Sequence, residues 1–164
     1  MADITRWLWY TIAARFNPTL MHRLYKKVGD IDKIYGFYEK ELREHGVDDE
    51  RFIDALCNKS LSAAERELMY CDAYGINLIT LEDKNYPFML SQIYDPPLVL
   101  YVRGTHFAPE NEVYVAVVGT RNATRYGLDM ARTISRDLAA AGITVVSGMA
   151  RGIDSAAHIG SMQA

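Results

Sequence analysis

The 164-residue sequence contains little cysteine and no long apolar run, and each shortage limits what the protein is. Its two cysteines, Cys57 and Cys71, have neither CxxC spacing nor clustered histidines. We therefore expect two buried, reduced thiols in a cytoplasmic protein, and neither a disulfide nor a metal site. Because no stretch of about 18 apolar residues occurs, we expect no membrane-spanning helix and no membrane partner. The N-terminus does not resemble a signal peptide, since Asp3 precedes the first apolar stretch and Arg6 and Arg15 bracket only eight residues.

The sequence also lacks the overall positive charge that is typical of proteins with a broad nucleic-acid-binding surface. Its formal net charge is −3, but the charge is uneven. Residues 1–112 carry 13 Lys and Arg against 18 Asp and Glu, a balance of −5, whereas residues 113–164 carry five Arg against three Asp, a balance of +2. Guanidinium groups suit phosphate oxygens, so the second part permits an anionic ligand, although a solvated surface gives the same count. These arginines are Arg121, Arg125, Arg132, Arg136 and Arg151.

Closely spaced glycines are missing from the loop where a nucleotide-binding motif would be expected. The segment VAVVGTRNATRYG, residues 115–127, is a predicted buried strand followed by a turn with glycines only at Gly119 and Gly127. Because these glycines are eight residues apart, neither GxGxxG nor GxxxxGKS/T is present. We therefore predict no mononucleotide or dinucleotide cradle at this loop, and no cofactor.

The first 75 residues are predicted to form a domain of short helices. Asn17 and Pro18 mark the start of one helix, and Gly29 marks its end. Asp48 is a predicted N-cap, and Ser62–Glu65 has the pattern of a capping box that opens a further helix. The local signals therefore predict an all-helical N-terminal domain.

In spacing, this N-terminal domain resembles a SAM-like or helix-hairpin-helix domain, but its first turn, Phe16–Pro18, has no glycine to present backbone N–H groups to DNA. We therefore favour protein contact or scaffolding over binding of duplex DNA. The aromatic side chains of the domain are spaced like core residues of small helices, and we predict packing rather than base stacking for them. They are Trp7, Trp9, Tyr10, Tyr25, Tyr35, Phe37 and Tyr38.

From residue 76 onward the apolar pattern changes to one of strands. Two lead-in strands are predicted at 76–81 and 98–104, followed by a polar loop at 105–112. Over 113–164, strand, helix, strand and helix alternate, and both strands are apolar on both faces as in parallel sheets. The fold class is therefore α/β, with the start of a doubly wound, Rossmann-like parallel sheet at 76–164. Since such sheets have about five or six parallel strands, we expect a truncated chain or the first part of a longer protein.

Two turns follow the predicted parallel strands, and each leads into a helix. Ligands of doubly wound folds bind at this edge of the sheet, where free backbone N–H groups and the helix dipole favour anions. The first turn carries Arg121 and Arg125, and the second, Ser147–Asp154, carries Arg151 among small residues that let a backbone approach phosphate. Side by side, the two turns would form a positive groove suited to a polyanion. Glycines at strand ends also serve simply to turn the chain, so an explanation without a ligand stays open.

Three segments of the sequence, in this order, resemble one known family. They are YPFMLSQIYDPPLVLYVRG (86–104), VAVVGTRNATRYG (115–127) and GITVVSGMARGIDSAAH (142–158). They resemble the DNA processing protein A (DprA/Smf) family, densely over about residues 80–164. The resemblance implies a doubly wound fold after a small helical domain, binding of single-stranded DNA, and loading of the RecA recombinase onto that DNA in natural transformation. It also implies a homodimer of the full-length protein and no enzymatic activity.

The resemblance further implies which residues contact DNA phosphate. Arg121 is in register with the arginine of the family's first loop, whereas Arg125 and Arg151 fall at variable positions of the pattern. Asp154 is predicted to be a helix cap rather than a ligand contact, and His158 to pack on its helix rather than act in catalysis. The predicted DNA-contacting residues are Gly119, Thr120, Arg121, Tyr126, Gly127, Ser147, Gly148, Ala150, Arg151, Gly152 and Ile153.

Two other functions stay open on the sequence alone. Phosphoribohydrolases of the lysine-decarboxylase-like (LOG) type share this fold and bind phosphate at similar loops, but their PGGxGT motif does not occur in these residues. A degenerate interaction module left by truncation would bind no DNA at any salt concentration. We expect the dimer surface and most of the RecA-binding surface of the family to lie beyond residue 164.

Overall fold

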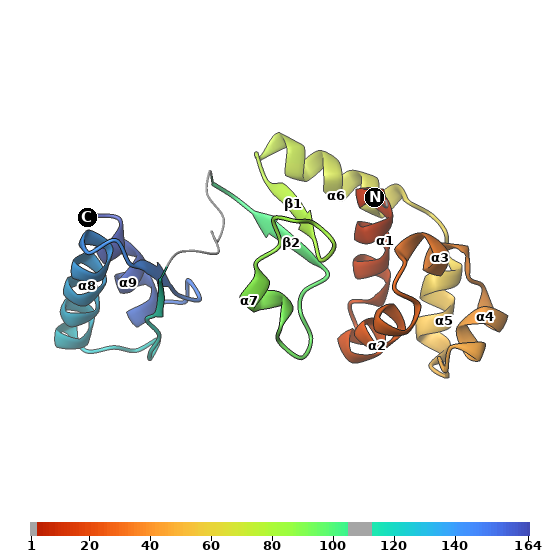
Figure 1. Cartoon of the computed structure of the whole chain (residues 1–164), viewed down its shortest axis with the longest axis horizontal. Helices are drawn as coiled ribbons and strands as arrows, with labels where there is room; N and C mark the ends of the chain where they lie inside the picture. Colours follow the sequence, from red (N-terminus) through yellow and green to blue (C-terminus); the bar gives the residue numbers. More distant parts are fainter. Residues whose placement is uncertain (1–2, 105–112) are drawn as a thin grey trace. The chain divides into compact units, whose positions relative to one another are not determined.

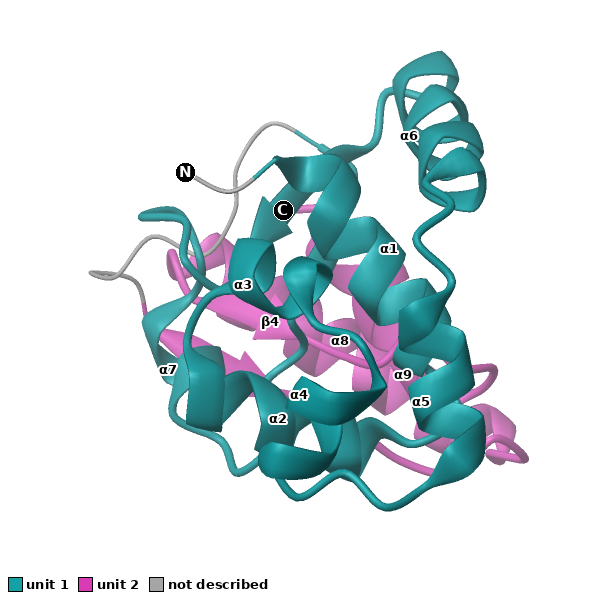
Figure 2. Ribbon diagram, turned by 90° about the vertical axis from the view of Figure 1, so that its right-hand side faces the viewer, with its two compact units in different colours: residues 1–107 teal, residues 108–164 magenta. Residues whose placement is uncertain are grey.

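The computed structural model describes residues 3–104 and 113–164, so the predicted polar loop at 105–112 lies outside the described residues. The chain forms two compact units, Met1–Phe107 and Ala108–Ala164, which Figure 2 draws in different colours. The sequence places a domain boundary after residue 75, whereas the structure divides into units after residue 107. Among the helices of the described ranges, none has the length and apolar character needed to cross a membrane.

Helices form most of the described part of the first unit (Figure 1), and an Asp or Asn side chain caps the start of four of them. Asp3 caps the first helix by accepting the Thr5 N–H at 3.0 Å. The predicted start at Asn17 is confirmed, since its side chain accepts the Leu20 N–H at 3.2 Å. Gly29 ends that helix, as predicted, in the left-handed conformation with a φ of 68°. These helices are α1 (Ile4–Ala14), α2 (Pro18–Val28), α3 (Ile31–Gly36), α4 (Glu39–Glu44), α5 (Glu50–Cys57) and α6 (Ser62–Ala73). The four with an Asp or Asn cap are α1, α2, α3 and α5.

Two predicted helix starts are wrong in detail. The N-cap of α5 is Asp49, one residue after the predicted Asp48, because the Asp49 carboxylate is the one that accepts an N–H of the first turn, at 3.1 Å. The predicted capping box at Ser62–Glu65 does not form. Instead, α6 begins after Leu61 without a side-chain cap, so the serine already lies inside the first helical turn.

The first unit has a core of large apolar side chains. Trp7, Tyr10 and Phe52 are almost completely buried, and the polar atoms of Trp9 and Tyr10 each donate to a main-chain carbonyl at 2.8 Å. The prediction that the aromatic residues pack rather than stack on bases is therefore confirmed for most of them. Tyr38 is the exception, since its side chain is 60% exposed. The others that pack against the core are Tyr25, Tyr35 and Phe37.

Both cysteines lie in this unit and are free. Cys71 is buried, as predicted, whereas Cys57 is only half-buried. The prediction of two buried thiols is therefore correct for one of them.

The two lead-in strands complete the first unit rather than starting the parallel sheet. β1 (Asn77–Thr80) and β2 (Val99–Val102) pair antiparallel, and α7 (Phe88–Ser91) lies in the connection between them (Figure 1). Leu98 and Val99 are buried against the helical core. The unit boundary therefore follows the strands, because side-chain packing decides it rather than the change of secondary structure after residue 75.

The second unit contains the predicted strand–helix–strand–helix order. Its strands pair in parallel, with Val115 opposite Val145. Its helices pack on each other and cross closely at Gly160, where an added Cβ would lie 2.2 Å from the Arg132 carbonyl oxygen. Any larger residue at that position would push the two helices apart. The elements are β3 (Tyr114–Ala116), α8 (Arg125–Ala140), β4 (Thr144–Val146) and α9 (Ile153–Ser161).

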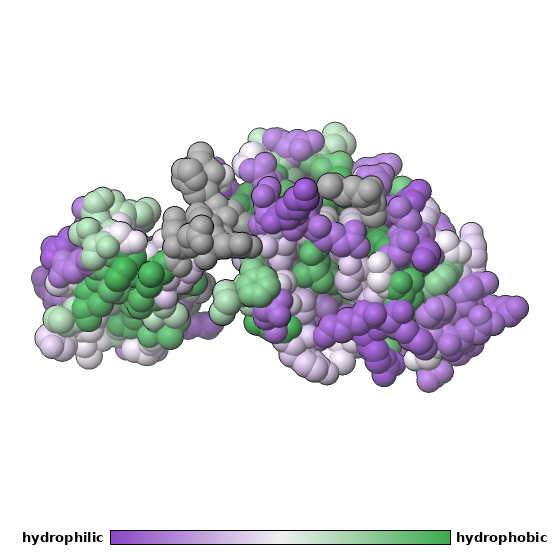
Figure 3. All heavy atoms as spheres, viewed as in Figure 1, coloured by the Kyte–Doolittle hydropathy of each residue, from purple (hydrophilic) through white to green (hydrophobic). Residues whose placement is uncertain are grey.

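The strands of this unit are exposed where the sequence predicts burial on both faces. Val118 and Val146 are 69% and 47% exposed, and along β3 the exposed Tyr114 and Ala116 alternate with the half-buried Val115. This alternation indicates that one face of the sheet is covered and the other is not. Apolar side chains consequently reach the surface of the second unit (Figure 3). Within the described residues the parallel sheet has two strands, so the doubly wound architecture is seen only in its first repeat.

Candidate nucleic-acid interface

The first loop connects β3 to α8 and carries an exposed arginine. The Asn122 N–H bonds the Thr120 hydroxyl at 3.2 Å, which folds the loop back on itself. Thr124 is the N-cap of α8, and its hydroxyl accepts the Gly127 N–H at 3.2 Å. Arg121 is exposed in the middle of this ordered turn. The loop is therefore held by its own hydrogen bonds while the guanidinium group stays in solvent.

The second loop connects β4 to α9 and is held from both sides. The Ser147 hydroxyl donates to the Val117 carbonyl at 2.7 Å, and Nε2 of His158 lies 3.3 Å from the Ser147 carbonyl oxygen. At the other end, the Ser155 hydroxyl donates to the Ala150 carbonyl at 2.6 Å. His158 thus supports the loop from α9, in agreement with its predicted packing role.

Between these hydrogen bonds the loop turns through Met149. Among the described residues it is the only non-glycine with a positive φ, 55°, and its side chain is 80% exposed. Such a conformation is unfavourable for a side chain larger than glycine, and it persists where the surrounding structure fixes the backbone. Arg151, two residues further on, is also exposed. The second loop therefore presents one apolar and one cationic side chain to solvent.

The two loops are in direct contact at Gly152. An added Cβ at this position would lie 2.2 Å from the Thr120 carbonyl oxygen, and φ is 90°, so both the space and the backbone conformation require glycine. The Ile153 N–H bonds the same carbonyl oxygen at 3.3 Å. Gly119 faces the Ile153 side chain, whose Cγ1 would lie 2.7 Å from an added Cβ. These small residues therefore have a packing reason that needs no ligand.

Asp154 joins the two loops by a hydrogen bond. It is 7% exposed, and its Oδ1 accepts the Gly119 N–H at 3.3 Å. The bond runs from the start of α9 to the residues that follow β3, so Asp154 has a structural role. The predicted helix cap is wrong in detail, since Gly152 is the N-cap of α9 and no side chain caps that helix. Because the Gly119 N–H is bonded inside the protein, it does not serve as a donor to a ligand in this conformation.

The start of α8 offers free donors, whereas the start of α9 is largely filled by the protein. In α9, the Ile153 and Ser155 N–H groups bond carbonyl oxygens of the two loops at 3.3 and 3.1 Å. In α8, the N–H groups of Arg125 and Tyr126 have no acceptor among the described residues. Their side chains are 96% and 75% exposed. The start of α8, with its positive helix-dipole end, is therefore the more favourable place for an anion.

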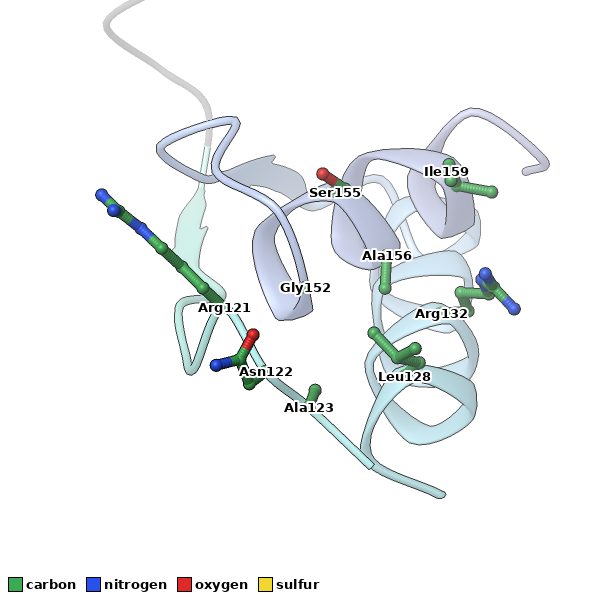
Figure 4. A pocket seen from close by; sticks show the side chains of 9 residues that line it. All are labelled: Arg121, Asn122, Ala123, Leu128, Arg132, Gly152, Ser155, Ala156 and Ile159. Atoms are coloured by element: carbon green, nitrogen blue, oxygen red, sulfur yellow. The ribbon is translucent and has the colours of Figure 1, made fainter. Parts of the chain in front are cut away.

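A pocket of about 570 Å³ lies between the first loop and the pair formed by α8 and α9 (Figure 4). At the loop end, Asn122 and Ala123 lie near Gly152, and the Arg121 side chain extends away from the helices. Arg132 of α8 lies at the opposite end. Pockets of this size commonly hold small organic ligands. The remaining lining residues are Leu128, Ser155, Ala156 and Ile159.

The structure brings together only part of the predicted DNA-contacting set. Arg121 and Gly152 line the pocket, whereas the other predicted residues form the loop junction, the second loop or the start of α8. Sequence reasoning missed Asn122 and Arg132. The four-residue spacing of Leu128 and Arg132 was a signal that both share one face of α8, but the sequence does not show that α9 packs beside that face.

Comparison with known proteins identifies relatives of the second half of the chain. A family model described as DNA recombination-mediator protein A matches residues 77–164. The chain is 40% identical over 90 residues to DNA processing protein DprA of Bacillus subtilis, covering 55% of this chain and 30% of that protein. It is 42% identical over 83 residues to Protein Smf of a Synechocystis species, covering 49% and 21%. The chain thus spans less than a third of the length of these curated relatives.

A solved structure extends the likeness to the N-terminal helices. The X-ray structure of DNA processing protein A from Streptococcus pneumoniae superimposes with a TM-score of 0.71 at 20% sequence identity. The match covers 99% of this chain and 55% of that one. The fold of the chain is therefore α/β and is shared with that protein, including the helices that precede the family match.

Proposed function

The chain belongs to the DNA recombination-mediator protein A family, and on this premise we propose that it binds single-stranded DNA and loads RecA recombinase onto it. In this proposal it acts as a mediator without enzymatic activity. The observation that carries the proposal is the set of exposed arginines at the two joined loops. Arg121 and Arg125 are exposed where α8 begins, and Arg151 is exposed on the second loop. Guanidinium groups beside free backbone N–H groups favour phosphate.

A strand of phosphates suits this arrangement better than a single nucleotide cofactor. Each loop carries its own exposed arginine, and the loops meet at Gly152, so the positive groups follow an edge of the unit. Contacts of this kind give affinity that is independent of sequence and sensitive to salt. The exposed side chains of Tyr126 and Met149 support a single strand in particular, because unpaired bases have faces on which such side chains pack.

Family membership is also the basis for proposing the protein partners. We propose RecA as the partner in DNA loading, a homodimer of the longer protein, and a role in natural transformation. The first unit is proposed to serve as a scaffold or a protein contact, since most of its aromatic side chains are packed in its core and do not reach a ligand.

Fluorescence anisotropy over a salt series tests the DNA proposal. We expect the chain to bind a labelled oligo-dT in preference to a duplex of equal length, with the logarithm of affinity falling linearly with the logarithm of salt concentration. Arg121→Ala is expected to weaken binding and to reduce the salt slope by about 0.7, the value for one phosphate contact on a single strand. Arg136→Ala serves as the control, because Arg136 is paired with Asp137 at 2.7 Å away from the loops.

Three outcomes separate the alternatives. Binding that depends on Arg121 and prefers the single strand supports the proposal. Failure to bind at low salt, by this chain and by a version extended with the following strands of a relative, would overturn it. In that case, hydrolysis of a nucleoside monophosphate would indicate a phosphoribohydrolase of the LOG type, and its absence an interaction module.

A further inference from the structure

We infer that the pocket between α8 and α9 is a nucleotide subsite for the bound strand, in which one base lies against the apolar wall and Arg132 contacts a neighbouring phosphate. The inference rests on the proposed function and deepens it. It assigns the pocket a ligand class, one nucleotide unit within a single strand. It also gives Arg132 a phosphate contact separate from that of Arg121.

The pocket has a polar group at each end and an apolar wall between them (Figure 4). Asn122 supplies an amide, which both donates and accepts hydrogen bonds, at the loop end. Arg132 supplies a guanidinium group at the opposite end. Leu128, Ala156 and Ile159 form the wall between these two groups. A nucleotide matches this arrangement: its flat base fits the apolar wall, the hydrogen-bonding edge of the base fits the amide, and its anionic phosphate fits the guanidinium group.

The protein neutralises the charge of Arg132 only weakly. Its Nη1 lies 3.4 Å from Oδ1 of Asp129, which is long for a hydrogen bond between charged groups. The same carboxylate faces Arg125 at 3.9 Å, so two arginines share one negative charge. The Nε of Arg132 is buried and has no hydrogen-bond partner among the described residues. Since Nε is buried, a phosphate at this end of the pocket would meet the Nη groups, in a guanidinium group with incomplete charge compensation.

Arg136, one turn further along α8, behaves differently. Its Nε and Nη2 both donate to Oδ1 of Asp137, at 3.0 and 2.7 Å. It does not line the pocket. The two arginines have the same chemistry and lie on the same helix, but only Arg132 combines weak pairing with a place at the pocket. Arg136 is therefore a matched control for the charge of the helix.

Close main-chain contacts form the pocket before any ligand binds. At Gly160 the α9 backbone approaches the Arg132 carbonyl, and at Gly152 the second loop approaches the Thr120 carbonyl; in each case an added Cβ would lie 2.2 Å away. A preformed site loses less conformational freedom when its ligand binds. The contact at Gly160 uses the main chain of Arg132, so truncation of the Arg132 side chain leaves the helix crossing intact.

The phosphate contact is tested with Arg132→Ala, Arg132→Lys and Arg136→Ala in the oligo-dT salt series. We expect Arg132→Ala to weaken binding several-fold and to reduce the salt slope by about 0.7. Arg132→Lys is expected to restore the slope because it restores the charge, and Arg136→Ala to leave both quantities unchanged. Thermal melting of each variant checks the fold. If Arg132→Ala has a lowered melting temperature, the salt slope of Arg132→Lys is used to test the phosphate contact.

The base contact is tested with an oligonucleotide of the same length that lacks bases at its central positions but keeps every phosphate. We expect it to bind the unaltered chain about fivefold or more weakly, the effect of losing one stacked base. The difference between the two oligonucleotides is expected to shrink in Ile159→Ser. That variant removes part of the apolar wall at a side chain that is 41% exposed, so the helix tolerates it.

Two results would overturn the subsite while the proposed function stands. One is an equal effect of Arg132→Ala and Arg136→Ala on the salt slope, with Arg121→Ala still weakening binding. The other is equal affinity for the two oligonucleotides. If the unaltered chain binds neither, the proposed function itself fails, and the subsite fails with it.

Discussion

The two units of the chain bury residues of very different size. Among the described residues, the largest fully buried side chains all lie in the first unit, from Trp7 to Leu98. The second unit buries small residues instead, among them Ala131, Ala156 and Ala157. The first unit is therefore stabilised by burial of large apolar side chains, whereas the second is shaped by close approaches of main chain to main chain.

The same contrast holds for cationic groups. In the first unit, Arg6 pairs with Asp32 at 2.8 Å, and the Lys59 ammonium group lies about 5 Å from the ring centres of Trp9 and Tyr38. In the second unit, the arginines of the two loops are exposed instead. Elsewhere in the second unit, Arg132 and Arg136 pair with aspartates of α8. The comparison teaches that the candidate site lies at the loop arginines, whose charges are not used in holding the structure, as is usual for functional sites.

The largest expected effect is a loss of stability of the first unit when a side chain is removed from its core. Phe52→Ala removes a completely buried ring and is expected to lower the free energy of unfolding of the first unit by about 3–5 kcal/mol. Both tryptophans, Trp7 and Trp9, lie in this unit, so denaturant unfolding followed by tryptophan fluorescence measures it directly. Oligo-dT binding under native conditions is expected to persist. A parallel loss of binding would mean that the second unit depends on the first.

The next largest effect is expected from a substitution that destabilises the second unit where its two loops meet. Gly152→Val places a side chain against the Thr120 carbonyl at a φ of 90°, and we expect a destabilisation on the order of 3 kcal/mol together with loss of oligo-dT binding. The tryptophan transition of the first unit should stay unchanged. Gly127→Ala is the control for stability alone, because its added Cβ meets its nearest atom at 3.5 Å; its binding is not compared, since Gly127 is one of the predicted DNA-contacting residues. Amide hydrogen exchange in residues 113–164 measures the stability of the second unit.

A smaller effect is expected at the hydrogen bond between the loops. Asp154→Ala leaves the Gly119 N–H without its acceptor and should cost about 1–2 kcal/mol in the second unit. Asp154→Asn should retain most of this stability, since its amide oxygen accepts the same bond. Hydrogen exchange of the Gly119 amide distinguishes the two variants. Equal exchange in both would show that the carboxylate charge, rather than the bond, is what matters.

The smallest expected effect is a pH dependence of the first unit. Burial lowers the pKa of His22 in α2, while the nearby Asp95 carboxylate acts in the opposite direction. Because the unfolded chain binds a proton at a higher pH than the folded one, this contribution to stability is complete above about pH 6.5 and is lost as the pH falls toward the folded pKa. The melting temperature should therefore decrease with acidification, and less so in His22→Gln. An identical slope in the variant would exclude His22 as the cause.

The sequence predicted the features that contacts between neighbouring residues determine, such as helix ends. It did not predict the features that depend on contacts between residues far apart in the chain. Asn17 and Gly29 bound α2 as predicted because capping involves only neighbouring residues. The strands at 77–80 and 99–102 pack with the first unit, which the sequence pattern did not indicate because their core partners come from helices far away in the sequence. The loop arginines followed from the strand–turn–helix pattern, whereas Arg132 needed the packing of α9 beside α8. That packing depends on Gly160, whose importance no local pattern indicates.

The contact between Gly152 and Thr120 means that the two loops cannot adjust separately. With no space between the main chains, a displacement of the first loop is transmitted to the start of α9, and the reverse is also true. The ligand contacts proposed for Arg121 and Arg151 are therefore made by two loops that move together. Their energies should not add: the double alanine variant is expected to depart from the sum of the single ones by more than about 0.5 kcal/mol, the usual limit for independent positions. Cooperativity along the bound strand would then begin within a single chain.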